Sequence, residues 1–288
     1  MDRGDAASVN ARLSIALAIA GSDSGGGAGI QADLKTFAAL GVHGASVVTA
    51  LTAQNTRNVR AIHYPPPGIV GAQIGAVLED FEVAAIKIGM LGIAAIVEVV
   101  AERLPSRFRL PEEAAARSPA TRPFLVYDPV MIASSGDSLS GGDFVEAIAH
   151  KLLPLVDCLT PNLAEAAALL GEPLARSEAD MARQGAALLK LGPRAVLMKG
   201  GHLEGKEAVD LLVTSQNIRR YSVRRVASRN LHGTGCTLSS AIAANVALGM
   251  ALPGAVASAK AFVCEAIERG RRITLGAGPG PLIQTKLG

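Results

Sequence analysis

Short apolar segments alternate with helix-like segments along most of the chain, and this alternation limits the fold more than any other feature. Apolar runs predict buried strands at 14–20, 42–53, 84–88, 124–127, 155–159 and 195–198. Amphipathic or alanine-rich patterns predict helices after most of them, and 208–213 with 219–226 alternates like a hairpin near a sheet edge. Strands and helices in this order predict an α/β protein with a mostly parallel sheet and helices on both faces.

Length and composition agree with one large α/β unit. The chain has 288 residues, of which 49% are hydrophobic and only 3% aromatic, so alanine, valine, leucine and isoleucine must build the core. We expect residues 1–12 to form a flexible tail and residues 13–288 to form a single domain. The charged, proline-containing segment 105–122 predicts a surface loop inside that domain, because the alternation resumes unchanged after it.

Charge and cysteine content argue against several partners and compartments. The formal net charge is +3, and the arginine cluster within 219–229 has no interleaved aromatics, so we interpret it as exposed strand faces and not a nucleic-acid site. No apolar run reaches the roughly 18 residues of a membrane span, and we interpret 13–20 as a buried strand in preference to a signal peptide. Three scattered cysteines without a CxxC pair indicate free thiols in a reducing cytoplasm.

Polar residues follow nearly every predicted strand at its carboxyl end. Gln54 ends the second strand, Asp128 the fourth, Asn162 the fifth and Lys199 the sixth, with Glu165 one turn into a helix. In open α/β sheets ligands bind outside these ends, so the side chains are expected to share a cleft. Each also has a structural explanation, since Asp128 precedes a proline and Asn162 with Glu165 forms an N-x-x-E capping pattern.

A glycine-rich segment in the C-terminal part of the chain predicts an anion site. His232-Gly233-Thr234-Gly235-Cys236 precedes an alanine-rich helix pattern, so glycine turns and unpaired helix N–H groups should form a hollow for an anion. Cys236 lies at its mouth, where a thiol is expected to lose its proton more easily than a free cysteine. The alternative is a helix start with a buried cysteine.

Carboxylates, an amide and an anion hollow at one sheet edge suit hydrated Mg²⁺ carrying phosphates, and thus phosphoryl transfer. No Walker A motif is present, so a nucleotide would be held in another way. The alternative is dinucleotide binding, since residues 27–32 fit a relaxed G-x-G-x-x-A pattern. That reading lacks the acid expected about 20 residues later, where Gln54 stands.

Six motifs in order carry a resemblance to a known family. They are AGSDSGGGAGIQAD at 20–33, KIGML at 87–91, DPVM at 128–131, TPN at 160–162 with Glu165, MKGGH at 198–202 and HGTGC at 232–236. Together they closely resemble the bacterial hydroxymethylpyrimidine/phosphomethylpyrimidine kinases of thiamine biosynthesis, in the ribokinase-like superfamily. The resemblance implies a three-layer α/β/α fold, a homodimer, and ATP- and Mg²⁺-dependent phosphorylation of 4-amino-5-hydroxymethyl-2-methylpyrimidine and then of its monophosphate to the diphosphate.

The resemblance also implies roles for individual residues. The pyrimidine is expected near Gly21, Asp33, Gln54, Met90 and Val130. ATP phosphates are expected near Asn162, Lys199 and Gly201, and the metal near Asp128 and Glu165. The catalytic group is Gly233, Thr234, Gly235 and Cys236, with the Cys236 thiolate as base in the first phosphorylation and its backbone N–H in the anion hole. His232 is expected to be a helix-entry residue.

The chain departs from the family pattern in three places. Ser134 replaces a usual lysine, the 105–122 segment is longer than usual, and Pro279 and Pro281 lie where a histidine is typical. Two alternative functions are also compatible with these motifs. A pyridoxal or pyridoxine kinase has the same fold and a similar ring, and a non-catalytic pyrimidine-binding regulator would keep the cleft without turnover.

Overall fold

A computed structural model describes residues 13–104, 122–131, 142–201, 203 and 205–285. Within these residues one nine-stranded sheet has the order β3-β2-β1-β4-β5-β6-β7-β8-β9. The strands are β1 (Ile15–Asp23), β2 (His43–Gln54), β3 (Val59–His63), β4 (Val83–Ile88), β5 (Phe124–Tyr127), β6 (Cys158–Leu159), β7 (Ala195–Lys199), β8 (Glu207–Thr214) and β9 (Ile218–Arg224). Neighbours from β2 to β7 pair in parallel, whereas β3, β8 and β9 pair antiparallel.

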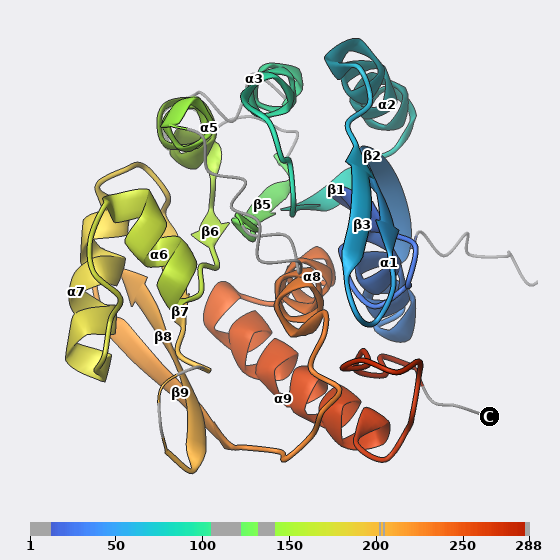
Figure 1. Ribbon diagram of the computed structural model, residues 1–288. Helices are drawn as coiled ribbons and strands as arrows, with labels where there is room; N and C mark the ends of the chain where they lie inside the picture. The colour runs from blue at the N-terminus through green and yellow to red at the C-terminus, as the bar shows by residue number, and fades with distance from the viewer. Residues whose placement is uncertain (1–12, 105–121, 132–141, 202, 204, 286–288) are drawn as a thin grey trace, which may run out of the picture.

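Helices cover both faces of the sheet (Figure 1). One face carries α1 (Gly29–Ala39), α8 (Thr234–Ala247) and α9 (Leu252–Gly270). The other carries α2 (Pro67–Asp80), α3 (Ala94–Arg103), α5 (Gly142–Ala147), α6 (Leu163–Leu170) and α7 (Glu178–Leu189). This arrangement confirms the predicted three-layer α/β/α fold with a mostly parallel central sheet.

The alternation of side chains along β1 shows how the sequence builds two cores. Leu17 and Ile19 join the larger apolar core, whereas Ala16 and Ala18 join the core that includes α8 and α9 residues. Successive residues of a strand point to opposite faces, so one buried strand supplies both cores. The small alanines let α1 and α8 approach the sheet closely, which brings the starts of both helices to the end of β1.

Three local differences from the sequence prediction have clear physical causes. β3 was not predicted, because it is a mostly exposed outer strand without a continuous apolar run. The strand expected over 155–159 is only Cys158–Leu159, because Leu153–Leu155 forms a 3-10 turn containing Pro154. The sequence pattern predicts one helix over 144–152, but in the structure this segment divides between α5 and a π-helical turn, Ile148–Leu152. The predicted tail 1–12, nearly all of the 105–122 loop and Ser134 lie outside the described residues.

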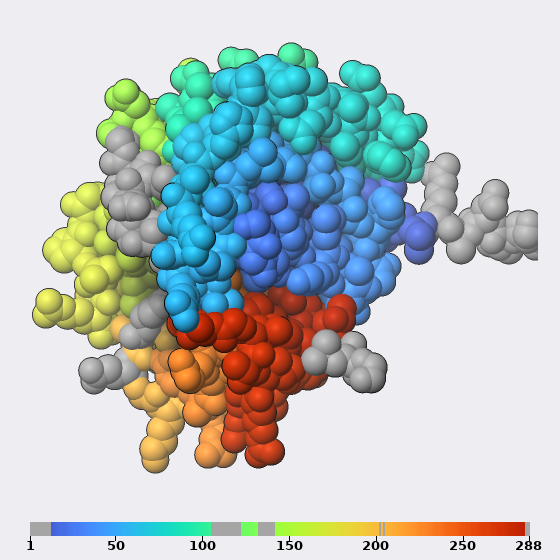
Figure 2. Space-filling model, turned by 45° about the vertical axis from the view of Figure 1, so that its right-hand side comes forward, coloured from blue at the N-terminus to red at the C-terminus, as the bar shows by residue number. Residues whose placement is uncertain are grey.

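The C-terminal segment lies against the β2–β3 hairpin. The N–H of Gly278 donates to Thr56 Oγ1 at 3.1 Å. Figure 2 shows this contact region from outside, where the cyan hairpin reaches the red C-terminal segment. The hairpin and this segment therefore support each other at the sheet edge where the strand ends collect. No helix among the described residues is both long enough and apolar enough to cross a membrane.

Candidate active site

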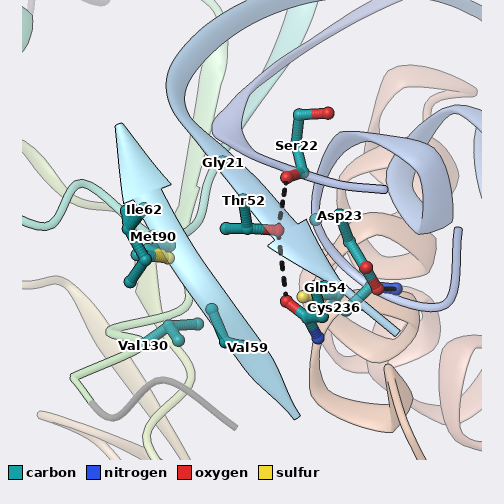
Figure 3. Close-up of a pocket in the computed structure, with 12 residues that line it drawn as sticks. Gly21, Ser22, Asp23, Thr52, Gln54, Val59, Ile62, Met90, Val130 and Cys236 are labelled. Carbon is teal, nitrogen blue, oxygen red and sulfur yellow. Dashed lines mark hydrogen bonds between the residues drawn. The ribbon is translucent and has the colours of Figure 1, made fainter. Parts of the chain in front are cut away.

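A pocket with one apolar and one polar side opens at the carboxyl ends of β1 and β2. Its lining residues are Gly21, Ser22, Asp23, Ala28, Gly29, Thr52, Gln54, Val59, Ile62, Met90, Val130 and Cys236. Figure 3 shows the apolar side chains gathered on one side, opposite the polar ones and the sulfur of Cys236. Such a pocket suits a small flat ring with polar substituents on one edge. Four of the five residues expected to contact the ring line it.

Asp23 organises the glycine-rich loop that forms the pocket floor. Its carboxylate accepts hydrogen bonds from the N–H groups of Gly25, Gly27 and Ala28 at 2.8, 3.1 and 2.9 Å. Burial on its own would raise the pKa of Asp23. Hydrogen bonds from His232 and the loop amides outweigh burial and lower that pKa. Asp23 is therefore a carboxylate that holds the loop closed.

His232 joins this loop to the end of β2. Its Nε2 lies 3.0 Å from Oδ2 of Asp23 and 3.2 Å from the side-chain amide of Gln54. A side chain at Gly27 would place its Cβ only 2.5 Å from the imidazole, so the ring packs directly on the loop. The residue that the sequence predicted to serve only at the helix entry thus also contacts two pocket residues.

The first turn of α8 leaves a hollow at the place where the sequence predicted an anion site. Gly233 has a φ of +87°, and it is the N-cap without a capping side chain. The N–H groups of Gly235 and Cys236 make no hydrogen bond to any residue in the described part of the chain. A Cβ at Gly235 would lie 3.2 Å from Lys199 Nζ and 3.4 Å from Asp128 Oδ2, so glycine leaves this space open. The hollow therefore combines helix amides, a positive helix end and an ammonium group.

Cys236 lines both the hollow and the ring pocket, but its acidity differs from the sequence prediction. Burial raises the pKa of its thiol to about 11, and the charges of Asp33 and Asp128 add to that effect. Lys87 and the N–H of Gly29 act in the opposite direction without compensating. The sequence predicted that Cys236 would lose its proton more easily than a free cysteine, which requires a lowered pKa. That prediction was wrong.

Lys199, at the end of β7, lies between the two carboxylates predicted to hold a metal. Its Nζ is 2.5 Å from Oδ1 of Asp128 and 3.8 Å from Oε2 of Glu165. Burial would lower the pKa of Lys199, but the two carboxylates raise it, so the side chain is an ammonium ion. Burial raises the pKa of Glu165 to about 7, with Lys199 opposing this shift.

Asn162 and Glu165 form the capping box expected from their spacing. The Asn162 side chain accepts from the N–H of Glu165 at 2.9 Å, and Glu165 Oε2 accepts from the N–H of Asn162 at 2.7 Å. The structural explanation for this pair is therefore correct. It also fixes Glu165 where its carboxylate faces Lys199, so the structural and functional readings are compatible. Gly201 follows β7 and is exposed near the same edge.

The donor set at this edge fits a partly hydrated Mg²⁺. Asp128 Oδ2 receives no hydrogen bond from a described residue, and Glu165 supplies a second carboxylate nearby. Within the described ranges no three His, Cys, Asp or Glu side chains cluster as a metal cage. Mg²⁺ commonly uses one or two carboxylates, waters and substrate phosphates, and not a full set of protein ligands.

Asp33 does not line the pocket, in contrast to the expectation from the resemblance. It is fully buried, and both of its oxygens lie 2.8 Å from Lys87 Nζ, while Ser240 donates to it at 2.7 Å. Asp33 therefore links α1, β4 and α8 beneath the site. Lys87 and Ser240 were not identified from sequence, although a lysine inside the apolar run of β4 was a usable signal for a buried ion pair.

An anion hollow at a helix start, a lysine and two carboxylates, all at the carboxyl edge of a mostly parallel sheet, define a phosphoryl-transfer enzyme of the ribokinase-like class. Comparison with known proteins then gives the family. The chain belongs to the phosphomethylpyrimidine kinase family, whose model matches residues 23–282.

Two curated relatives are similar over almost the whole chain. The hydroxymethylpyrimidine/phosphomethylpyrimidine kinase of Rhizobium meliloti is 51% identical over 268 residues, which cover 93% of this chain and 96% of the relative. The protein of the same name from Escherichia coli is 45% identical with the same coverage. This chain is accordingly a kinase.

Two solved kinase structures are also similar to this chain. A crystal structure of phosphomethylpyrimidine kinase from Clostridium difficile matches with a TM-score of 0.73 and 42% identity, covering 89% of this chain and all of that one. A pyridoxal kinase from Staphylococcus aureus, in complex with AMP-PCP and pyridoxal, matches with a TM-score of 0.82 and 31% identity, covering 95% and 94% of the two chains.

Proposed function

We propose that this kinase transfers phosphoryl groups from ATP first to 4-amino-5-hydroxymethyl-2-methylpyrimidine and then to its monophosphate, as a step in thiamine biosynthesis. The observation that carries the proposal is the position of Cys236, which lines the ring pocket and belongs to the anion hollow at the start of α8. An alcohol on a ring in the pocket would therefore meet a phosphoryl group in the hollow. The names of the relatives support this pyrimidine as substrate.

The pocket walls support the proposed ring position. Met90 and Val130 supply apolar surface for a ring face, and Gln54 supplies an amide for the polar ring edge. Gly21 keeps the floor open, because a Cβ there would lie 3.4 Å from the sulfur of Met90. A hydroxymethyl group on the ring would then point toward Cys236.

The migrating phosphoryl group is assigned to the amides of Gly235 and Cys236, next to Gly233 and Thr234. Unpaired N–H groups that are fixed before the reaction stabilise developing negative charge without reorganisation. Lys199 adds a positive charge beside them. Asn162 and Gly201 lie near the same edge and are proposed to contact the remaining ATP phosphates. The complexes of pyridoxal kinase with AMP-PCP and with ADP support ATP as the donor.

Asp128 and Glu165 would hold a hydrated Mg²⁺, which would supply charge neutralisation for the ATP phosphates when bound. The protein's own contribution is to hold both carboxylates at one place beside a cation. Lys199 lies close to both and opposes the rise in the pKa of Glu165.

The two phosphorylations place different demands on Cys236. An alcohol must lose its proton in the first step, and the Cys236 thiolate is the proposed acceptor. The acceptor in the second step is a phosphate oxygen that is already ionised. The backbone N–H of Cys236 serves in both steps.

The proposed function is tested by ADP formation with three acceptors: the hydroxymethylpyrimidine, its monophosphate and pyridoxal. We expect turnover with both pyrimidines and a kcat/KM for pyridoxal that is lower than for the first pyrimidine. A preference for pyridoxal would assign the protein to the pyridoxal kinases. Tight pyrimidine binding without ADP formation would indicate a regulator.

We also propose a cytoplasmic homodimer. Among the described residues the three cysteines are free thiols, which supports a reducing compartment. β3 is an outer strand, and Leu51 on the neighbouring β2 is 49% exposed, which supports a protein contact on this hairpin. Light scattering of the wild type and of Leu51→Asp tests the dimer; a wild-type monomer would contradict it.

A further inference from the structure

We propose that Thr49 is a positioning residue for the ring pocket, because its buried hydroxyl holds the Met90 carbonyl and so sets where the Met90 side chain lies against the ring. Among the described residues Met90 lines the pocket and Thr49 does not, so Thr49 acts through Met90. This inference rests on the proposed function for its substrate. Its structural part can be tested without a substrate.

The hydroxyl of Thr49 donates to the carbonyl oxygen of Met90, and the two oxygens lie 2.5 Å apart. Thr49 is fully buried, so water does not compete for this contact. Within the described part of the chain no backbone N–H donates to the same carbonyl. Removal of the hydroxyl therefore takes from the Met90 carbonyl the one donor that the described residues give it.

β2 carries one extra residue next to the pocket floor. β1 advances by two residues where β2 advances by three, between the pairs Ala20–Val48 and Ser22–Leu51. Residues 49 and 50 therefore lie together opposite Gly21, which lines the pocket. An extra residue of this kind bends a strand locally and re-aims a side chain, and such bulges are frequent beside active sites.

The contact between Thr49 and Met90 crosses a strand. β1 lies between β2, which carries Thr49, and β4, which Met90 follows. Glycine at position 21 of β1 leaves room for this approach, because a Cβ there would lie 3.4 Å from the sulfur of Met90 and 3.5 Å from the Cβ of Ala50. The Thr49 hydroxyl thus joins β2 to the turn that supplies the apolar side of the pocket, where Figure 3 shows Met90 near Ile62.

The turn that carries Met90 is fixed on both sides of this carbonyl. The N–H of Gly89 donates to the carbonyl of Ile19 at 2.9 Å, and Leu91 is fully buried in the larger core. The carbonyl between them is held by Thr49. A methionine side chain has three rotatable bonds, so the direction of its backbone decides which part of the pocket its sulfur can reach. Loss of the hydroxyl frees the peptide group to rotate and the sulfur to leave the ring face.

Steady-state kinetics test the effect on recognition. Thr49→Val keeps nearly the same shape without the hydroxyl, whereas Thr49→Ser keeps the hydroxyl. We expect Thr49→Val to raise the KM for the aminopyrimidine about tenfold, because a small misplacement in the site is costly, and to leave the KM for ATP within about twofold. Thr49→Ser should be close to wild type. Equal rises in both KM values in Thr49→Val would overturn the proposal.

Thr36→Val is the matched control for the loss of a buried hydroxyl. Thr36 is also fully buried, and its hydroxyl donates to the carbonyl of Ala32 at 2.7 Å within α1. It is not among the residues that line the pocket. Thr36→Val should keep the wild-type KM for both substrates. A rise in its pyrimidine KM equal to that of Thr49→Val would contradict a specific role for Thr49.

A double-mutant cycle separates positioning from general damage to the sheet. In a Met90→Ala background the side chain that Thr49 positions is absent, so Thr49→Val should change the pyrimidine KM less than about twofold further. A full effect of about tenfold in that background would show that Thr49 does not act through Met90.

Crystal structures of the ligand-free wild type, Thr49→Ser and Thr49→Val test the structural part directly. We expect the Met90 sulfur at the same place in the first two and displaced from Gly21 in Thr49→Val; an unmoved Met90 in Thr49→Val would refute the proposal. If Thr49→Val does not fold, wild-type crystals with the hydroxymethylpyrimidine decide, since a ring on Met90 with the Thr49 contact broken is incompatible with positioning. If the wild type fails to phosphorylate the pyrimidine, the proposed function fails, while the ligand-free structures still decide whether Thr49 positions Met90.

Discussion

The ammonium group of Lys199 lies 2.5 Å from Oδ1 of Asp128, although Lys199 ends β7, Asp128 follows β5, and β6 lies between these two strands. The pair closes one side of the anion hollow, where Gly235 leaves space beside both groups. Lys199 thus neutralises a buried carboxylate and offers positive charge to a phosphate. We expect these two roles to be separable by mutation.

Lys199→Met should lower kcat by about 10- to 100-fold and raise the KM for ATP, because a charge-assisted contact to phosphate is worth about 1.5–3 kcal/mol. The KM for the pyrimidine should change little. Steady-state kinetics with each substrate varied in turn measure this split. Lys190→Met, at an exposed lysine after α7, is the control and should behave as wild type. An unchanged kcat in Lys199→Met would exclude a role at the phosphates.

Gly233→Ala should abolish activity, since Gly233 has a φ of +87° and an added Cβ would collide with the carbonyl oxygen of Gly27. Gly249→Ala is the matched control, because its φ is +91° with nothing within 4 Å of the new Cβ. Gly249→Ala should cost only the backbone strain, about 1–2 kcal/mol, and keep its kcat. Thermal unfolding and kcat for both variants distinguish strain from collision. Equal effects would show that contact with the Gly27 loop is unimportant.

The pKa of Cys236 predicts a difference between the two phosphorylations. With a pKa raised to about 11, the thiolate fraction increases about tenfold per pH unit between pH 7 and 9. The kcat/KM of the first phosphorylation should rise with pH over this range, and that of the second should not rise with it. Cys236→Ala should remove the rise and slow the first step by about 10²-fold or more. Cys264→Ala is the control at another free cysteine. Parallel pH profiles for both steps would remove the thiolate as base.

Lys87→Met should destabilise the fold more than it affects binding. It leaves the carboxylate of Asp33 fully buried without a cation, and breaking such a pair costs about 3–5 kcal/mol. Adding Asp33→Asn should restore part of that loss, because an uncharged amide can still accept from Ser240. Urea unfolding of the single and double variants measures both values. A loss below about 1 kcal/mol in Lys87→Met would contradict the buried pair.

The sheet, its flanking helices and the gathering of polar residues at one edge were predictable, because strand periodicity and parallel topology depend on local sequence. β3 was not, because an exposed outer strand gains its stability from pairing with β2, which no local pattern reveals. The positions of Asp33 and His232 were also hidden. Their partners Lys87, Gln54 and Asp23 are distant in sequence, and only the packing of α1 and α8 on the sheet brings them together.

The acidity of Cys236 was mispredicted for a related reason. A helix start lowers the pKa of a thiol, and that part was visible in the glycine-rich motif. The opposing effects, burial and the charges of Asp33 and Asp128, come from elements remote in the chain. Motifs therefore located the site, whereas tertiary packing determined its electrostatics.

A crystal structure with AMP-PCP, Mg²⁺ and the hydroxymethylpyrimidine tests the central claim most directly. We predict that the terminal phosphate accepts hydrogen bonds from the N–H groups of Gly235 and Cys236, with the ring against Met90 and its hydroxymethyl oxygen facing the Cys236 sulfur. A terminal phosphate bound away from the start of α8, or a ring outside this pocket, would contradict the account.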